Sequence, residues 1–244
     1  MSEVAPRIRR VGSDLINAYL IEDGGDIVIV DAGAPSYWRE LLAELAAMGR
    51  SFDDVRALVL THGHDDHKGF AEQARRAGVP VRVHEHDAAL ARGDVPNRFS
   101  IAGPIRPIPT IRFLAHFARH GLLRTPKILE VATFPSGTTL DVPGAPQVTH
   151  VPGHTAGSVA LLFPQHDALL VGDALNTLSV LSGRTGPQLS PFNADRSLAL
   201  ESLGALEGLS ATNVLPGHGA PWHGGVATAV AAVRASEVAR LVRA

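Results

Sequence analysis

Cysteine is absent from all 244 residues of the sequence. This excludes disulfide bonds, thiolate zinc sites, cysteine-ligated iron–sulfur clusters and a cysteine nucleophile. Lysine occurs only twice, as Lys68 and Lys127, so the other basic side chains are arginines. The 22 basic residues nearly balance the 24 acidic ones. Such a charge is not that of a nucleic-acid-binding protein, and we expect a small-molecule substrate instead.

Long apolar runs are also absent. The opening residues, MSEVAPRIRRVG, contain no stretch of signal-peptide length, and the apolar run 159–163 is far shorter than a membrane span. We therefore expect a soluble, cytoplasmic protein. The 45% share of hydrophobic residues is ample for a buried core. The sequence is expected to form one domain over residues 1–244, with an irregular and partly helical insert at about 92–130.

Outside that insert, the hydrophobic pattern predicts strands and helices of ordinary length. Strands are expected at 17–22, 26–30, 57–60, 81–84, 138–142, 147–151, 158–163, 168–171 and 213–215. Helices are expected at 36–48, 66–77 and 195–206, and from about residue 225 onward. Ser36 is the expected N-cap of the first helix, and Gly49 its expected end.

The insert differs from the rest of the chain in composition. It holds five prolines, and its seven basic residues against two acidic ones give a local charge of 7 − 2 = +5. Apolar residues at helical spacing predict a helix between a possible cap at Thr110 and a stop at Gly121. This helix is either a surface helix with a solvated basic face or a lid that places Phe113 and Phe117 near a substrate pocket. In the second case its arginines and histidines would meet an anionic group.

Three histidines and two aspartates crowd the segment Thr61-His-Gly-His-Asp-Asp-His67, directly after an apolar strand. His62 and His64 lie two positions apart in an extended turn, while Asp66 and His67 fall on the expected first helical turn. Four potential ligands thereby enter one small volume. Imidazole and carboxylate ligands suit zinc, iron and manganese. A solvated polar helix start is the competing interpretation, but so many unpaired polar groups beside a buried strand need compensation.

Three further ligand types occupy loops at the ends of predicted strands. His154, Asp173 and His218 each lie beside a glycine, which lets the backbone approach a ligand closely. Each alone is more typical of a turn residue than of a ligand. Together with the histidine cluster they indicate a metal site built on strand ends.

These positions resemble the motifs of the metallo-β-lactamase superfamily of metallohydrolases, and the resemblance runs from about Asn17 to His218. It implies an α/β fold, the four-layer αββα sandwich of that family. It also implies two sets of metal ligands. His62, His64 and His154 would bind the first ion, Asp66, His67 and His218 the second, and Asp173 would bridge them. Asp31 would orient a ligand histidine through a hydrogen bond.

Two such ions, about 3.5–4 Å apart, can share a water and lower its pKa toward neutrality. The resulting hydroxide would attack a carbonyl or phosphorus centre, with Asp66 orienting it or transferring a proton. No protein nucleophile is required, in agreement with the absence of cysteine and of a Gly-x-Ser-x-Gly elbow. We therefore expect a metal-dependent hydrolase that holds two divalent ions. Zinc is the expected metal, with iron or manganese as alternatives.

The ligand set also bears on the substrate. Asp173 in the bridging position, together with the missing cysteine, resembles glyoxalase II, lactonase and RNase Z-like members more than β-lactamases. A small ester, thioester or lactone is thus the expected substrate. Only about 26 residues follow His218, so we do not expect a dedicated glutathione thioesterase of the glyoxalase II type. Three alternatives stay open: a mononuclear-iron oxidoreductase resembling persulfide dioxygenases, a phosphodiesterase or nuclease, and a non-catalytic metal-binding scaffold.

The remaining histidines have weaker signals. His84 and His86 follow a predicted strand and are expected at the surface or behind the ligands. His116 and His120 have an i,i+4 spacing that can bind metal, but they lack a carboxylate partner in the insert, which favours a polar helix face. Lys68 follows the cluster directly and is expected at the pocket rim or in solvent.

Overall fold

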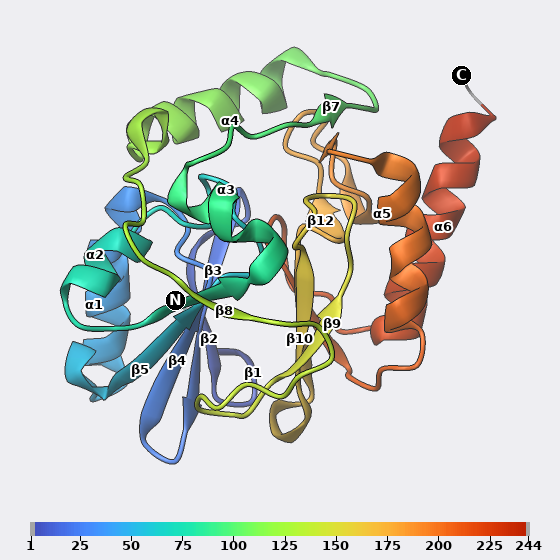
Figure 1. Ribbon diagram of the computed structural model, residues 1–244. Coiled ribbons are helices and arrows are strands. Elements are labelled where there is room, and N and C mark those ends of the chain that lie inside the picture. Colours follow the sequence, from blue (N-terminus) through green and yellow to red (C-terminus); the bar gives the residue numbers. More distant parts are fainter. Residues whose placement is uncertain (1–2, 243–244) are drawn as a thin grey trace.

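The computed structural model of the protein describes residues 3–242, and most of its strands form two sheets that face each other (Figure 1). The larger sheet has the order β1 (Glu3–Ala5), β2 (Ile8–Ser13), β3 (Ile16–Asp23), β4 (Asp26–Val30), β5 (Val55–Val59), β6 (Val81–His84) and β8 (Ala132–Phe134). The smaller sheet has the order β15 (Asn213–Pro216), β11 (Ala168–Gly172), β10 (Val159–Phe163) and β9 (Gln147–His150). Two strand pairs complete the set: β12 (Asn176–Leu178) with β13 (Thr185–Gln188), and β14 (Phe192–Asn193) with β7 (Ser100–Ile101).

Helices cover the outer face of each sheet, as Figure 1 shows. The α-helices are α1 (Trp38–Ala47), α2 (Ala71–Arg76), α3 (Ala88–Arg92), α4 (Pro107–Arg119), α5 (Arg196–Ser202) and α6 (Val226–Leu241). Short 3₁₀ helices are η1 (Pro35–Tyr37), η2 (Phe52–Asp54), η3 (Glu85–Asp87), η4 (Leu122–Arg124), η5 (Pro164–His166) and η6 (Leu203–Leu206). α1 and α2 lie beside the larger sheet, and α5 and α6 beside the smaller one.

Three groups of buried apolar side chains fill the spaces between these layers. Ile21, Val28 and Leu161 belong to the group that joins the inner faces of the two sheets. Leu41 and Leu45 of α1 pack against the outer face of the larger sheet, and α5 and α6 pack in the same way on the smaller one. β10 and β11 are buried along their whole length, which explains their uninterrupted apolar sequence. The predicted αββα order is confirmed.

The strand directions bring several loops to one edge. β4, β5, β6 and β8 are parallel neighbours, and so are β11 and β15. The carboxyl ends of parallel strands meet at the same edge of a sheet, which is where open α/β sheets bind ligands. The segments that follow β5, β11 and β15 carry six of the seven predicted ligands, and the segment after β4 carries Asp31, so the topology draws them together.

Some predicted element boundaries are wrong. The expected helix 66–77 is formed only as Ala71–Arg76, because the preceding residues fold into turns that present the histidine cluster. The expected strand 138–142 is absent apart from a single bridge between Thr139 and Gln147. Ser36 lies inside η1 and does not cap a helix. Thr110 lies inside α4, where its hydroxyl donates to the Leu181 carbonyl at 3.0 Å.

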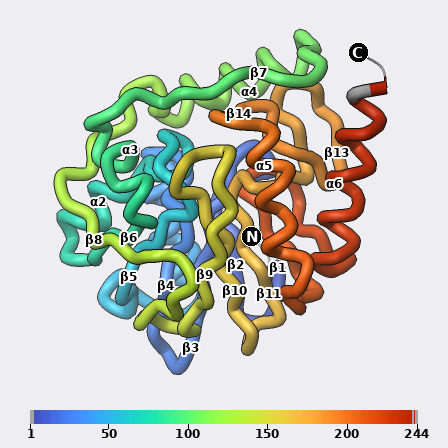
Figure 2. Tube along the Cα trace, turned by 45° about the vertical axis from the view of Figure 1, so that its right-hand side comes forward, coloured from blue at the N-terminus to red at the C-terminus, as the bar shows by residue number. Residues whose placement is uncertain are grey.

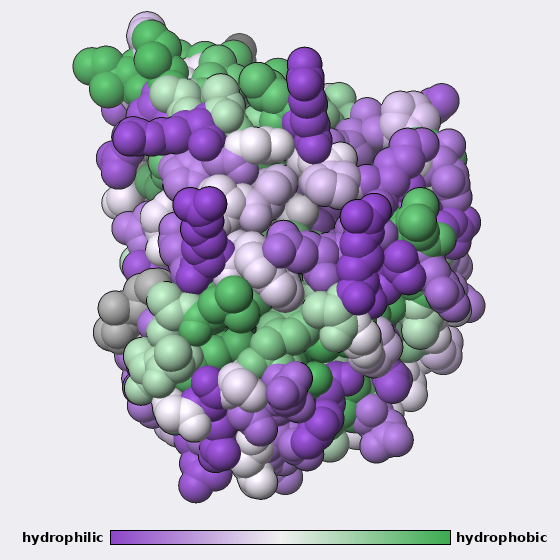
Figure 3. Space-filling model, turned by 90° about the vertical axis from the view of Figure 1, so that its left-hand side faces the viewer, coloured by the Kyte–Doolittle hydropathy of each residue, from purple (hydrophilic) through white to green (hydrophobic). Residues whose placement is uncertain are grey.

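The segment 92–130 leaves the sheets at the end of α3 and returns at β8. Within it, α4 lies along the top of the molecule next to β7 in both Figure 1 and Figure 2. Apolar surface gathers along this upper edge in Figure 3, with hydrophilic side chains among it. Gly121 follows α4 with a φ of +86°, a conformation suited to a helix end. No transmembrane helix is found among residues 3–242.

Candidate metal centre

All seven predicted ligands lie at the common edge of the two sheets. His62, His64, Asp66 and His67 occupy turns after β5, His154 lies between β9 and β10, and Asp173 and His218 follow β11 and β15. Their ligand atoms form three overlapping groups: His62, His64 and His154; His62, His67 and Asp173; Asp66, His67 and His218. A Cβ atom at Gly217 would stand 2.4 Å from Asp173 Oδ1 and 2.5 Å from His67 Cε1. Glycine is therefore required beside this centre.

The first group directs three nitrogens at one point. His154 Nε2 lies 3.1 Å from His62 Nε2 and 2.9 Å from His64 Nδ1. Nitrogens bound to one tetrahedral zinc ion stand roughly 3.3 Å apart, given zinc–nitrogen bonds of about 2.0–2.1 Å. All three rings are buried. The spacing thus fits three ligands of a single ion.

Asp173 stands between the first group and the second. Its Oδ1 lies 3.4 Å from His67 Nε2, and its Oδ2 lies 3.2 Å from His218 Nε2 and 3.6 Å from His154 Nε2. His218 Nε2 is also 3.4 Å from Asp66 Oδ2. Since one carboxylate faces histidines of both groups, it has the position that a bridging ligand requires.

Several buried atoms of this centre lack a hydrogen-bond partner among the described residues. They include His67 Nε2 and Asp173 Oδ1. In the neutral His67 ring Nδ1 carries the proton, because it faces the Asp31 carboxylate at 2.8 Å, and the Nε2 lone pair then faces a carboxylate oxygen. Leaving such groups unpaired costs about 1–3 kcal/mol each. A divalent cation between them removes this cost, so the residues present fit a metal.

The protonation states of the first ligand group point the same way. Burial, together with the neighbouring imidazoles, lowers the pKa of His62 and His64 well below the usual histidine value. Burial also lowers the pKa of His154. Burial opposes protonation of His67 and His218 as well, but Asp31 and Asp173 outweigh it at His67 and Asp173 outweighs it at His218, so both pKa values are raised. The first group therefore consists of neutral imidazoles, the form that binds metal.

Asp31 holds His67 and the residue that precedes His62 in place. Besides the His67 contact, its carboxylate accepts hydrogen bonds from the Thr61 amide at 2.8 Å and from the Thr61 hydroxyl at 2.8 Å. Asp31 has a φ of +60°, a left-handed conformation that is strained for a non-glycine residue. The backbone carries this strain while the carboxylate reaches His67, in the orienting position that the resemblance implies.

Asp87 is a functional candidate that sequence reasoning missed. It is 1% exposed, and its carboxylate accepts hydrogen bonds from the Gly63 amide at 2.8 Å, the Thr155 hydroxyl at 2.7 Å and the Gly157 amide at 2.7 Å. Gly63 separates His62 from His64, and Thr155 directly follows His154. One buried carboxylate therefore joins the two loops that carry the first ligand group. Its only sequence signal is an aspartate shortly after a strand.

A cavity of about 250 Å³ opens onto the centre. One side is formed by His64, Asp66, His154, Asp173 and His218, and the other by Phe99, Phe113, Leu114, Phe117 and Phe192, with Asp65 and Asn97 completing the lining. The expected phenylalanines of α4 thus line it. No arginine or lysine does so among the described residues.

Other singled-out residues have structural contacts. His116 Nε2 bonds with the Tyr37 hydroxyl at 2.8 Å and His120 Nδ1 with the Ser36 hydroxyl at 2.7 Å, so the pair fastens α4 to η1. Lys68 is buried, and its ammonium pairs with Asp65 at 3.1 Å. His84 and His86 do not join the centre but approach His150.

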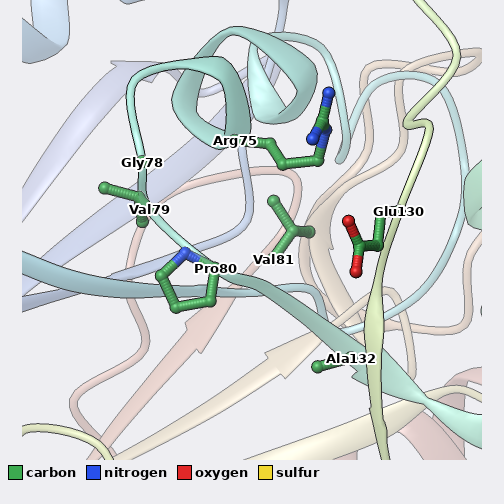
Figure 4. A pocket seen from close by; sticks show the side chains of 7 residues that line it. All are labelled: Arg75, Gly78, Val79, Pro80, Val81, Glu130 and Ala132. Atoms are coloured by element: carbon green, nitrogen blue, oxygen red, sulfur yellow. The ribbon is translucent and has the colours of Figure 1, made fainter.

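A separate hollow of about 270 Å³ lies between the loop after α2 and β8 (Figure 4). Its charged side chains are Arg75 and Glu130, and Arg75 already donates to Glu72 at 2.8 Å. None of the predicted ligands lines it. It has no part in the metal centre.

Comparison with known proteins supplies independent information. A family model described as the metallo-beta-lactamase superfamily matches residues 11–218. "Probable metallo-hydrolase YflN" of Bacillus subtilis (strain 168) is 28% identical over 241 residues, covering 91% of this chain and 87% of that protein. A crystal structure of TTHA1623 "in a di-iron-bound form" is 29% identical with a TM-score of 0.61, covering 89% of this chain and 93% of that chain.

The name of a further relative states the substrate of that protein. The "Acyl-coenzyme A thioesterase MBLAC2" of Bos taurus is 28% identical over 214 residues, which cover 83% of this chain and 72% of that protein.

Proposed function

The chain belongs to the metallo-beta-lactamase superfamily, and we propose that this metallo-hydrolase uses two metal ions to cleave a small ester, thioester or lactone whose acyl part is apolar. The observation that carries the proposal is the position of Asp173. Its two oxygens face histidines of both ligand groups, at 3.2–3.6 Å. A carboxylate placed in this way supports two neighbouring ions more readily than one.

We assign His62, His64 and His154 to the first ion, Asp66, His67 and His218 to the second, and Asp173 to both. When bound, two such ions activate a shared water and polarise the substrate oxygen. Asp66 lines the cavity and is only partly buried, so its carboxylate can accept a hydrogen bond from the attacking water and hold it in line. Asp31 and Asp87 hold the ligand histidines in orientation.

The cavity supports an apolar acyl group as the substrate part next to the centre. Four phenylalanines and Leu114 line its outer side, and such a wall favours hydrocarbon through the hydrophobic effect. A phosphodiester would find no arginine or lysine among the described lining residues. The arginines of the insert thus give the nuclease hypothesis no support at this cavity. The bovine relative named as an acyl-coenzyme A thioesterase agrees with a thioester.

The test is a metal analysis of purified, tag-free protein, coupled to a substrate panel. The panel contains acyl thioesters and nitrophenyl esters of increasing chain length, lactones, and bis(p-nitrophenyl) phosphate. We expect two tightly held ions per chain, cleavage of the acyl substrates, and rising kcat/KM with acyl length. One iron per chain with oxygen consumption and no hydrolysis would overturn the proposal, and so would cleavage of the phosphodiester alone.

A further inference from the structure

A second histidine cluster lies outside the dinuclear centre and shares no residue with it. His84, His86 and His150 each offer a ligand nitrogen, and these nitrogens lie within 4.8 Å of one another. We call these three residues the outer histidine cluster. No carboxylate of the dinuclear centre belongs to it, so the proposed hydrolysis leaves its chemistry unexplained.

The fold assembles this cluster from both sheets. His84 ends β6 of the larger sheet, His150 ends β9 of the smaller sheet, and His86 lies in η3. The rings of His84 and His150 stack at a centroid distance of 4.6 Å, and the His86 ring lies 4.9 Å from His84 and 5.6 Å from His150. Since β6 and β9 belong to different sheets, the fold brings the two rings together, and at their interplanar angle of 12° one ring has to turn for both nitrogens to face one ion.

The hydrogen bonds around His150 prepare it as a ligand. Its Nε2 lies 2.8 Å from the Ala156 carbonyl oxygen, which can only accept, so Nε2 carries the proton and Nδ1 offers a lone pair. The same arrangement holds at His218, whose Nδ1 donates to the Leu15 carbonyl. Metal-binding histidines commonly have such a second bond, because it fixes the tautomer and the ring orientation.

The other two members can also supply a nitrogen. His86 is exposed, and its ring makes no hydrogen bond within the described residues, so it can turn toward the cluster without disturbing the core. His84 is fully buried; its Nδ1 accepts from the His86 amide at 3.3 Å and its Nε2 lies 3.0 Å from the hydroxyl of Ser136, so one of these two bonds has to give way before His84 binds an ion. Ser136 itself is exposed, so its hydroxyl can give way to an ion.

The surroundings of the outer histidine cluster favour neutral imidazole rings, which can bind a metal ion. Burial and the neighbouring imidazoles of His150 and His86 lower the pKa of His84, so it stays neutral. The nearby Glu85 and Asp87 carboxylates act in the opposite direction on this pKa, with a smaller effect. Neutral imidazoles are ligands for first-row divalent ions such as zinc, nickel and copper.

We propose that the outer histidine cluster is a third metal site, which binds one divalent transition-metal ion through His84, His86 and His150 and leaves a coordination position to water. An ion here would tie the end of β6 to the end of β9. His150 bonds to Ala156, two residues beyond His154, so the ion would also steady the loop that carries this ligand. The site does not depend on the proposed hydrolytic function.

The experiment uses purified, tag-free protein that keeps its tightly held metals. Zinc is titrated into it by calorimetry, and Co²⁺ is added in parallel to record visible absorption. The test variant is His86→Ala, whose side chain is exposed. His223→Ala is the matched control, because it also removes an exposed histidine, far along the chain from the cluster.

We expect one further equivalent of zinc to bind per chain in the wild type and in His223→Ala, and none in His86→Ala. The Co²⁺ difference spectrum between wild type and His86→Ala should contain the absorption of a histidine-ligated ion, while the tightly held metals are unchanged. Absence of a further equivalent in the wild type would overturn the proposal. An equal further equivalent in His86→Ala would do the same.

Discussion

The loops at the strand ends bury polar side chains, whereas residues 92–130 expose apolar ones. Six of the seven ligand candidates are less than 9% exposed, and Asp66 is intermediate. Among residues 3–242, nine of the 13 exposed large apolar side chains belong to the insert: Val95, Phe99, Ile101, Ile105, Ile108, Ile111, Leu114, Leu123 and Leu129. The two regions meet at the cavity above the metal centre.

This difference in burial indicates that the ligand loops and the insert have separate roles. The ligand loops are fixed by buried carboxylates, since Asp31 and Asp87 each accept three or more hydrogen bonds within the site. The insert is held by Phe113 and the contacts of His116 and His120 in and next to α4, and by the buried side chains of Leu122 and Ile128. Under the proposed function, the first region governs metal binding and chemistry, and the second governs which acyl group fits.

The largest effect is expected from Asp173→Asn, which removes one charge from the centre between the two ligand groups. We expect loss of one metal and a fall in kcat of at least about 100-fold, beyond the usual effect of changing an outer partner. Metal analysis and initial rates check this. The control is Asp141→Asn, an exposed aspartate with no side-chain hydrogen bond among the described residues. Full metal content and full activity in Asp173→Asn would show that Asp173 does not bridge the two ions.

Asp87→Asn should act on the first ligand group alone. An amide offers one acceptor oxygen in place of a carboxylate that takes three hydrogen bonds. We expect affinity for one ion to fall by about 10–100-fold, with a loss of about 1–3 kcal/mol in the free energy of unfolding. Chelator competition measures the metal affinity, and urea denaturation measures the free energy of unfolding.

Glu85→Gln is the matched control for Asp87→Asn, because it changes an exposed carboxylate two positions away. Reduced stability of Asp87→Asn with both metals held as tightly as before would show that Asp87 supports the fold and not the ligands.

Phe99→Ala should change substrate preference without touching the metals. Phe99 lines the cavity and is 49% exposed, so truncation costs the fold little. Loss of its partial contact with an acyl chain should lower kcat/KM for long-chain substrates by about 10-fold, with little change for acetyl ones. Ile101→Ala is the control, because Ile101 is 53% exposed in the same segment and does not line the cavity. An equal loss of kcat/KM for short-chain and long-chain acyl substrates would contradict a role of the insert in selecting the acyl group.

The smallest effect is expected from Ile108→Ser. Ile108 is 82% exposed on α4 and lies outside the cavity at the metal centre. The free energy of unfolding should stay within about 0.5 kcal/mol of the wild type, with kcat and KM unchanged. Thermal denaturation and kinetics check this, and a large loss in either would show that the outer face of α4 does more than surround the cavity.

The sequence predicted what depends on local pattern. Strands 26–30 and 81–84 were predicted as observed, because apolar runs between turn residues signal buried strands directly. The helix predicted from about residue 195 begins there in the structure. Asp195 is its N-cap, and the Asp195 side chain accepts a hydrogen bond from the Leu198 amide. The seven ligand candidates could be proposed because they stand in short motifs just after predicted strands.

What the sequence could not predict depends on distant contacts. The turns at 61–70 replace the first part of an expected helix because they must aim His64, Asp66 and His67 at ligands far along the chain. The expected strand 138–142 precedes Pro143 and Pro146, which interrupt a sheet ladder. Asp87 acts on Gly63 and Thr155, which are 24 and 68 residues away, so no local pattern marks it.

The central claim is that Asp173 joins two metal ions. Anomalous diffraction at the absorption edge of the metal, from crystals of the purified protein, tests it most directly. The account predicts two peaks about 3.5–4 Å apart, one beside His62, His64 and His154 and the other beside Asp66, His67 and His218, with Asp173 in contact with both. A single peak at this centre, with Asp173 bound to one ion alone, would contradict it.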